Sequence, residues 1–412
     1  MRIFACLLVF ALSSGAQAAG RLEVRVGIDE GDMRGSDHRV LQGAIDYVAG
    51  LGGGVVNVGP GRYVFRNAIM LRSNVHLRGT EGKTVFVACD GAQIGLAADA
   101  PAGAREIRLA DTGGLRVGDG IVLRDGAASG FAITTTTLVQ HIDGKTFRMS
   151  DPLVHDYAMD RKATATLAFP VVAGWNVKEV VLENVAIEGN RAKAAASMDG
   201  CRAAGIYFYN SEKITIRNCS VRDYRGDGIS VQWKSKEVLV EGCRVENNAV
   251  FGLHPGSDST ACVFRRNRSL GNGGPGLFVC VAVRNCRFEQ NVLRNNGGEG
   301  VSIGERDSDN VFRENEIIGN TRAGVLFRGD TKGEELEPHR NLFEKNTILD
   351  NGTAAGVIVR GAPRGLVFRD NLVGFGAPRA EALGFTHGKG IPELNLDANR
   401  YQHVTREVEV RD

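Results

Sequence analysis

Apolar and polar residues alternate in short segments along most of the chain, and these segments recur at a nearly fixed spacing. One set reads IRNCSV, VEGCRV, FRRNRS, FEQNVL, FRENEI, FEKNTI and FRDNLV, and its fourth position is Cys219, Cys243, Asn267, Asn291, Asn315, Asn346 and Asn371. The intervals between these residues are 24, 24, 24, 24, 31 and 25. A period of two indicates β-strands, and self-similarity at such spacing indicates a stacked repeat.

A second set of segments opens with glycine and is offset from the first within each repeat. It reads GIYFY, GISVQ, GLHPG, GLFVC, GVSIG, GVLFR and GVIVR, beginning at Gly205, Gly228, Gly252, Gly276, Gly300, Gly324 and Gly356. A unit of this size cannot bury its own apolar side, so the units must stack. The pattern therefore predicts an all-β fold, a right-handed parallel β-helix whose strand columns form parallel sheets with coils about 4.8 Å apart.

Two columns of the repeat are expected to fill the interior. The asparagines should point inward, where stacked amides bond to one another along the column. The pairs Cys219/Cys243 and Cys262/Cys286 each share a column. We expect these thiols to be core fillers and not disulfides.

The ends of the chain and one internal stretch depart from the repeat. Residues 1–18 read as a signal peptide and residues 19–95 as an N-terminal cap with the first coils. An amphipathic helix is expected within residues 36–54, capped by Ser36 or Asp37. Residues 96–165 lose the repeat and predict a small β insertion, coils then run over 166–375, and residues 376–412 are expected to form a C-terminal cap.

The first 18 residues and the overall charge bear on location and partners. Arg2 precedes an apolar run over residues 3–12, and Ala16-Gln17-Ala18 has the pattern of a cleavage site. No later apolar run reaches the roughly 18 residues of a membrane span. We expect a bacterial protein that is secreted or periplasmic and is not inserted in a membrane. The net charge of +2 is spread along the chain, which argues against nucleic acid as a partner.

Side chains at alternate positions after each leading glycine should point outward and form one face of the stack. This face predicts an elongated groove for a polysaccharide or oligosaccharide, with Tyr207 and Tyr209 as a stacking platform and small residues as a floor. The expected substrate-binding residues are Tyr207, Tyr209, Gln232, Lys234, Asp258, Arg306 and His339.

Three kinds of function fit such a groove. A lyase or C5-epimerase acting on an acidic glycan needs a base and a cation, for which His254 and Arg328 are the leading candidates. A glycoside hydrolase needs two carboxyl groups about 5–10 Å apart, and Glu305 or Asp307 with Asp330 would meet that spacing. A glycan-binding or surface-structural protein without catalysis is the third alternative.

Metal ions and cysteines add little to this picture. Asp307 and Asp309 in ERDSDN could bind Ca²⁺, although Asp-x-Asp in a turn commonly serves only the turn. We therefore expect either no cofactor or Ca²⁺. Seven cysteines follow the signal peptide, and none forms a C-x-x-C pair. The spacing thus predicts no structural zinc site.

Two stretches resemble a known superfamily. The helix over residues 36–54, followed by GGVVNVGPGRYVF and a Leu-Arg-Gly turn, resembles the N-terminus of the pectate-lyase-like right-handed β-helix superfamily. The coil region is similar to that of polysaccharide lyases and mannuronan C5-epimerases, which implies a carbohydrate-active protein. The epimerase motif Tyr-Gly-Phe-Asp-Pro-His aligns with residues 251–256, where Gly252 and Pro255 match. His254 stands at the motif's Asp position and Gly256 at its His position.

Overall fold

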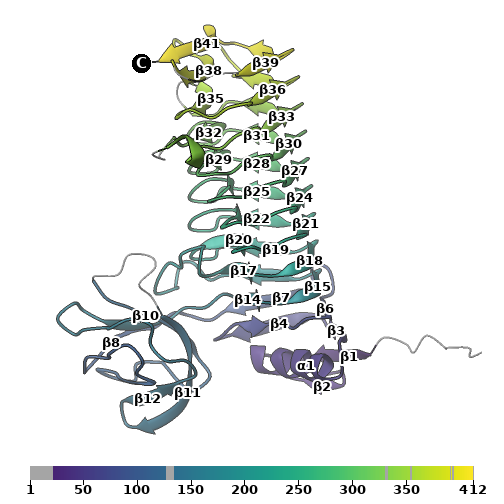
Figure 1. Ribbon diagram of the computed structural model, residues 1–412. Coiled ribbons are helices and arrows are strands. Elements are labelled where there is room, and N and C mark those ends of the chain that lie inside the picture. Colours follow the sequence, from purple (N-terminus) through teal and green to yellow (C-terminus); the bar gives the residue numbers. More distant parts are fainter. Residues whose placement is uncertain are drawn as a thin grey trace, which may run out of the picture.

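The computed structural model describes residues 22–126, 134–329, 333–352, 355–389, 391 and 394–411. The predicted signal peptide lies outside these residues. Three sheets run along a tall stack of coils, with a separate lobe beside its lower end (Figure 1). All strand pairs in the three sheets are parallel, which confirms the predicted right-handed parallel β-helix fold. No helix in this part of the chain is long and apolar enough to span a membrane.

We call the three long sheets A, B and C. Sheet A contains, in spatial order, β2 (Met33–Arg34), β1 (Glu23–Gly27), β3 (Gly54–Val58), β6 (Val75–Arg78), β15 (Lys178–Glu183), β18 (Glu212–Arg217), β21 (Leu239–Glu241), β24 (Val263–Arg265), β27 (Arg287–Glu289), β30 (Val311–Arg313), β33 (Leu342–Glu344), β36 (Val367–Arg369) and β39 (Asn395–Asp397). Sheet B contains β4 (Gly61–Phe65), β7 (Thr84–Ala88), β16 (Ala186–Glu188), β19 (Ser220–Arg222), β22 (Arg244–Glu246), β25 (Arg268–Leu270), β28 (Val292–Arg294), β31 (Glu316–Ile318), β34 (Thr347–Leu349), β37 (Leu372–Gly374) and β40 (Arg400–Gln402). Sheet C, which carries the glycine-led segments, contains β5 (Ile69–Met70), β14 (Val172–Trp175), β17 (Ala204–Tyr209), β20 (Asp227–Gln232), β23 (Leu253–Pro255), β26 (Leu277–Phe278), β29 (Val301–Ile303), β32 (Val325–Phe327), β35 (Ala355–Val359), β38 (Leu383–Gly388) and β41 (Arg406–Arg411).

A helix and an antiparallel sheet complete the architecture, as the sequence predicted. Helix α1 (His38–Gly50) covers the first coil, and the side chain of its cap Asp37 accepts a hydrogen bond from the Arg39 amide. The insertion forms β8 (Gln93–Gly95), β13 (Thr164–Leu167), β10 (Gly120–Arg124), β11 (Thr134–Asp143), β12 (Thr146–Met149) and β9 (Glu106–Arg108), in that spatial order. A short 3-10 helix, η1 (Glu334–Leu336), lies in the longest repeat.

The C-terminal segment differs from the expected cap. Strands β38, β39, β40 and β41 all lie beyond residue 376, and they extend sheets A, B and C in the parallel sense. The repeat is invisible in the sequence here because glycine and asparagine no longer mark the turns at a regular interval. Asn399 nevertheless continues the asparagine column by accepting from the Asn371 side chain at 2.9 Å.

The interior confirms both predicted columns. The side-chain nitrogen of Asn267 donates to the oxygen of Asn291 at 3.0 Å, and Asn291 donates to Asn315 at 3.0 Å. Cys219, Cys243, Cys262 and Cys286 are buried free thiols. The structure adds a second asparagine ladder, which the sequence analysis did not identify, formed by Asn248, Asn272, Asn296, Asn320 and Asn351. Each ladder satisfies buried polar groups between coils, so the turns can pack without water.

Proline interrupts the regular pairing in the middle of sheet C. Pro255 pairs in register with Val231 on one side. On the other side it has no N–H to donate to β26. The only register pair between β23 and β26 is Leu253 with Leu277.

An ion-pair cluster on sheet A yields a stability prediction. Glu183 receives hydrogen bonds from Arg78 and Arg217 and lies 2.6 Å from His76 Nε2. Burial raises the pKa of Glu183, but Arg217, Arg78 and His76 outweigh it and hold the pKa at about 2. The pKa of Glu183 is lower in the folded state than in the unfolded state. The stabilisation that ionised Glu183 contributes to the fold is therefore complete above pH ~4.3 and is lost as the pH falls through about 2.

We therefore expect Glu183→Gln to lower the free energy of unfolding at pH 7 by about 2 kcal/mol, after discounting for the partly exposed arginines. The difference from wild type should shrink as the pH approaches 2. Chemical denaturation at several pH values measures both. Glu212→Gln, which removes an exposed pair with Lys236 on the same sheet, should change stability by less than about 0.5 kcal/mol. A deficit at Glu183→Gln that does not vary with pH would contradict the assignment.

Candidate functional site

Three aromatic rings line up where the strands of sheet C end. Trp175 ends β14, Tyr209 ends β17, and Trp233 follows β20 directly. Their ring centroids are 5.0 Å apart for Trp175–Tyr209 and 6.1 Å apart for Tyr209–Trp233, with the planes stacked. Trp175 is 36% and Trp233 44% exposed, so the rings offer an apolar surface to solvent across successive coils. We call these three residues the aromatic ladder.

Tyr207 does not belong to that exposed surface, which corrects the sequence-based expectation. Its side chain is buried because the end of the segment 189–203, between β16 and β17, lies over sheet C at Gly200 and Cys201. The Tyr207 hydroxyl donates to the Cys201 carbonyl at 2.8 Å, and Ser230 Oγ donates to the Gly200 carbonyl at 2.7 Å. We call residues 189–203 the covering segment.

The other predicted binding residues nearest the ladder lie at different depths. Gln232 is buried, and its amide donates to Ser230 Oγ at 3.0 Å. Lys234 is exposed, with its Nζ 5.4 Å from the Trp233 ring. Asp258 is exposed in the turn after β23. Only Lys234 therefore adds a charge directly to the aromatic ladder.

Below the covering segment, Asp227 and His254 form a buried pair. His254 Nδ1 lies 2.6 Å from Asp227 Oδ2, while Asp227 Oδ1 accepts from the Phe251 amide at 3.0 Å. The backbone of the covering segment passes directly over them, since a Cβ on Gly200 would lie 1.7 Å from Asp227 Oδ2. The sequence analysis placed His254 at the groove surface. The structure instead leaves it 1% exposed.

Two cysteines complete this cluster. Ligand atoms of Cys201, His254 and Cys280 all lie within 4.8 Å of one another. The hydrogen bond with Cys201, aided by His254 and Arg328 and opposed by burial, lowers the pKa of Cys280 to about 4. Burial lowers the pKa of His254, but Asp227 and Cys280 outweigh it and raise the pKa to about 9. Cys280 is half-buried, whereas His254 is only 1% exposed.

Arg328 reaches back over two coils toward the same cluster. Its guanidinium donates to Ser302 Oγ and to the Val279 carbonyl, both at 3.0 Å, and its Cζ lies 4.4 Å from the Phe278 ring centroid. A Cβ on Gly304 would lie 1.8 Å from Arg328 Nη2, so only glycine leaves room for this path. The side chain is 16% exposed, and its Nη2 also lies 3.8 Å from Asp307 Oδ2, so the guanidinium is a partly exposed, partnered charge near Cys280.

The predicted hydrolase carboxylates Asp307 and Glu305 lie in different surroundings. Asp307 is fully buried and accepts from the amides of Val283 and Gly304 at 2.9 and 2.8 Å, so its outward placement is corrected. Burial raises its pKa to about 8, although Arg328 and the two amides favour the anion. Glu305 pairs with Arg306 at 2.9 Å. Asp330 lies outside the described residues.

The proposed calcium ligands and His339 also have other partners. Asp309 binds Arg340 through both carboxylate oxygens, at 2.7 and 2.8 Å, while Asp307 faces the interior. His339 Nδ1 accepts from the Arg364 amide at 3.0 Å. These contacts assign Asp307 and Asp309 to different sides of one turn, which does not suit a shared Ca²⁺.

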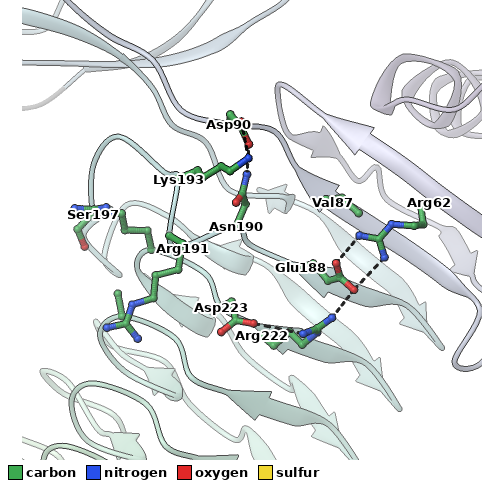
Figure 2. Close-up of a pocket in the computed structure, with 13 residues that line it drawn as sticks. Arg62, Val87, Asp90, Glu188, Asn190, Arg191, Lys193, Ser197, Arg222 and Asp223 are labelled. Atoms are coloured by element: carbon green, nitrogen blue, oxygen red, sulfur yellow. Dashed lines mark hydrogen bonds and ion pairs between the residues drawn. The ribbon is translucent and has the colours of Figure 1, made fainter.

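A cavity of about 970 Å³ lies on the sheet B side, lined by charged residues. Figure 2 shows that its charges face one another: Arg62 and Arg222 both bind Glu188. Lys193 binds Asp90 at 3.2 Å. The lining has five basic and three acidic residues, and Arg191 and Arg225 donate to the carbonyls of Asn247 and Ala194. We favour the sheet C face because the aromatic ladder lies there.

Sequence analysis missed Trp175, Trp233 and Cys201 and treated Cys280 only as part of a groove floor. Trp175 and Trp233 stand just past the strand ends, outside the alternating frame used to select outward residues. Cys201 lies in the covering segment, which has no repeat register. For Cys280, the available signal was its column, since it follows Gly276 at the same offset as Arg328 follows Gly324.

Comparisons with known proteins agree with the fold. A family model described as a right handed beta helix region matches residues 175–317. No curated protein sequence matches the chain. The structure is similar to the A-module of the Azotobacter vinelandii mannuronan C-5 epimerase AlgE4, with a TM-score of 0.61 and 15% identity over 94% of this chain and 98% of that chain. The AlgE6 A-module from the same organism gives a TM-score of 0.56 and 17% identity over 90% and 91%.

A third similar structure is ORF18 of Geobacillus virus E2, with a TM-score of 0.53 and 11% identity, covering 94% of this chain and 60% of that chain. At these identities the likeness is one of fold. This fold is the right-handed parallel β-helix that the repeat had indicated.

Proposed function

We propose that the protein is an exported enzyme that modifies an acidic polysaccharide on the sheet C face, by lyase- or epimerase-type chemistry. The observation that carries this proposal is the aromatic ladder, because it spans three coils of the sheet C face that also carries Arg328 and the buried Asp227–His254 pair. Stacked rings bury the apolar faces of sugars, and a repeating ladder suits a repeating polymer. The fold shared with two epimerase modules supports the same substrate class.

The proposed chemistry uses two groups on the sheet C face, Arg328 and His254. Removing the C5 proton of a uronate leaves negative charge on its carboxylate, which the Arg328 guanidinium would stabilise. The neutral form of His254, oriented by Asp227, would take the proton, reached from the side of Cys280 and Arg328. Because the pKa of His254 is raised to about 9, this form and the turnover should increase as the pH rises toward 9. Breaking the C4–O bond then completes a lyase reaction, and returning a proton to the opposite face completes an epimerisation.

A non-catalytic glycan-binding protein is the second candidate. One observation favours it: the aromatic ladder is exposed, whereas the covering segment closes over His254. The hydrolase alternative loses support because Asp307 is buried. Its Glu305–Asp330 form stays a prediction.

The test combines turnover and binding on a panel of uronate polymers. Ultraviolet absorbance detects the unsaturated product of a lyase, and NMR of the polymer detects an epimerase. Trp233→Ala should weaken the Kd for the glycan about tenfold, corresponding to ~1.4 kcal/mol of lost stacking.

The matched control is Tyr47→Ala, which removes an aromatic side chain that is 56% exposed on α1, outside the aromatic ladder. It should leave the Kd unchanged. Binding without turnover would select the second candidate, and equal losses at Trp233 and Tyr47 would refute the sheet C face as the glycan site.

A further inference from the structure

Three potential metal ligands converge beneath the covering segment. Cys201 comes from the covering segment, His254 from β23 and Cys280 from the turn after β26, so 53 and 26 residues separate successive ligands. Their donor atoms nevertheless lie within 4.8 Å of one another. The absence of C-x-x-C spacing therefore does not preclude a site, because the coil stack brings distant residues together.

The imidazole provides an independent indication of a ligand. His254 Nε2 is buried and has no hydrogen-bond partner, although the residue is only 1% exposed. An unsatisfied buried polar atom costs about 1–3 kcal/mol. Asp227 accepts a hydrogen bond from Nδ1, so a metal ion that displaces the Nε2 proton would find the Nε2 lone pair next to the two sulfurs. A carboxylate behind the imidazole is the usual support of a histidine that binds metal.

We propose that Cys201, His254 and Cys280 bind a thiophilic metal ion, with Zn²⁺ as the ion to be tested. Two thiolates and a neutral imidazole match the donors that zinc prefers, and two thiolates balance its charge. Three protein ligands leave a fourth position for water. The bound ion would fix the covering segment to sheet C through Cys201.

This inference goes beyond the proposed function, and metal binding can be measured without any glycan. With the ion in place His254 is a ligand, so proton transfer in the proposed reaction would pass to the water at the fourth position. A protein that binds no metal could still turn over the glycan, and a protein without turnover could still bind Zn²⁺. The two proposals can therefore fail independently.

The experiment uses the full chain, reduced under anaerobic conditions, stripped with a chelator and then loaded with Zn²⁺ or Co²⁺. We expect one Zn²⁺ per chain after desalting. Bound Co²⁺ should show the thiolate charge-transfer absorption and the intense visible bands of a tetrahedral site. Asp227→Asn should weaken Zn²⁺ binding about 10–100-fold, since it removes the support of the imidazole.

Cys201→Ser is the decisive variant, because Cys201 lies in the covering segment and outside the coil core. It should abolish stoichiometric binding with unchanged circular dichroism. Cys89→Ser, which replaces a half-buried free thiol outside the cluster, should retain it. Two results would overturn the proposal: equal Zn²⁺ uptake by Cys201→Ser, or a native Cys201–Cys280 disulfide whose reduction gives no metal uptake.

Discussion

Turnover of the acidic glycan should fall about 100-fold when Arg328 is replaced by alanine, with a smaller change in KM. The reason is that a charge developing on the uronate in the transition state loses its fixed partner, and such a group contributes about 10²–10³ in kcat. The guanidinium is preorganised by Ser302 Oγ and the Val279 carbonyl, each at 3.0 Å. Arg328→Lys keeps the charge but cannot make both contacts, so we expect it to recover only part of kcat.

Arg360 provides the control for this prediction. It occupies the same column one coil further along sheet C and is exposed. Arg360→Ala should change kcat by less than about threefold, as expected for a surface charge that is not directed at the reacting centre. Steady-state kinetics on the polymer identified by the panel measures all three variants, and thermal melting establishes that each is folded. Equal kcat for Arg328→Ala and wild type would remove Arg328 from the proposed chemistry.

The second large effect concerns stability. Asn291→Ala should lower the free energy of unfolding by about 4 kcal/mol, because it deletes a member from the middle of a buried ladder. Asn291 accepts from the backbone and side-chain nitrogens of Asn267 at 3.0 Å and donates to the Phe264 carbonyl at 2.8 Å. Each partner left unsatisfied in the interior costs about 1–3 kcal/mol.

Gln290→Ala is the matched control, since Gln290 precedes Asn291 but is exposed and only contacts Glu314. It should change stability by less than about 0.5 kcal/mol. Chemical denaturation followed by circular dichroism compares the two variants. If both lose the same amount, the ladder bonds are not the source of the stability.

Much of the fold could be predicted because its determinants repeat. Three signals recur along the chain: the interval of 24 residues, the inward asparagines and the leading glycines. Because each occurs several times, a chance match at one coil does not change the predicted fold. Helix α1 was also predictable, since Asp37 and the spacing of Leu41, Ile45 and Val48 suffice to define a capped amphipathic helix. The final coil was not predictable, because β38–β41 use the same sheets with a different set of turn residues.

The site was less predictable because it depends on the covering segment, residues 189–203, whose sequence does not follow the repeat. Alternation correctly assigned His254 and Tyr207 to the outer side of sheet C, but the covering segment then buried both. The direction of that segment is set by contacts such as Ser230 with the Gly200 carbonyl, which join residues far apart in sequence. The position of Asp307 was mispredicted for a similar reason. Its place in a turn does not reveal whether its carboxylate faces solvent or accepts from two backbone amides, as it does here.

The asparagine ladder also makes the length of the protein adjustable. Asn267, Asn291 and Asn315 each offer the same donor and acceptor to the coil on either side. A duplicated or lost 24-residue segment would therefore leave every ladder bond with an equivalent partner. Each such event would lengthen or shorten the stack by about 4.8 Å. A change in the number of repeats can thus alter the length of the sheet C face while conserving the way the core is built.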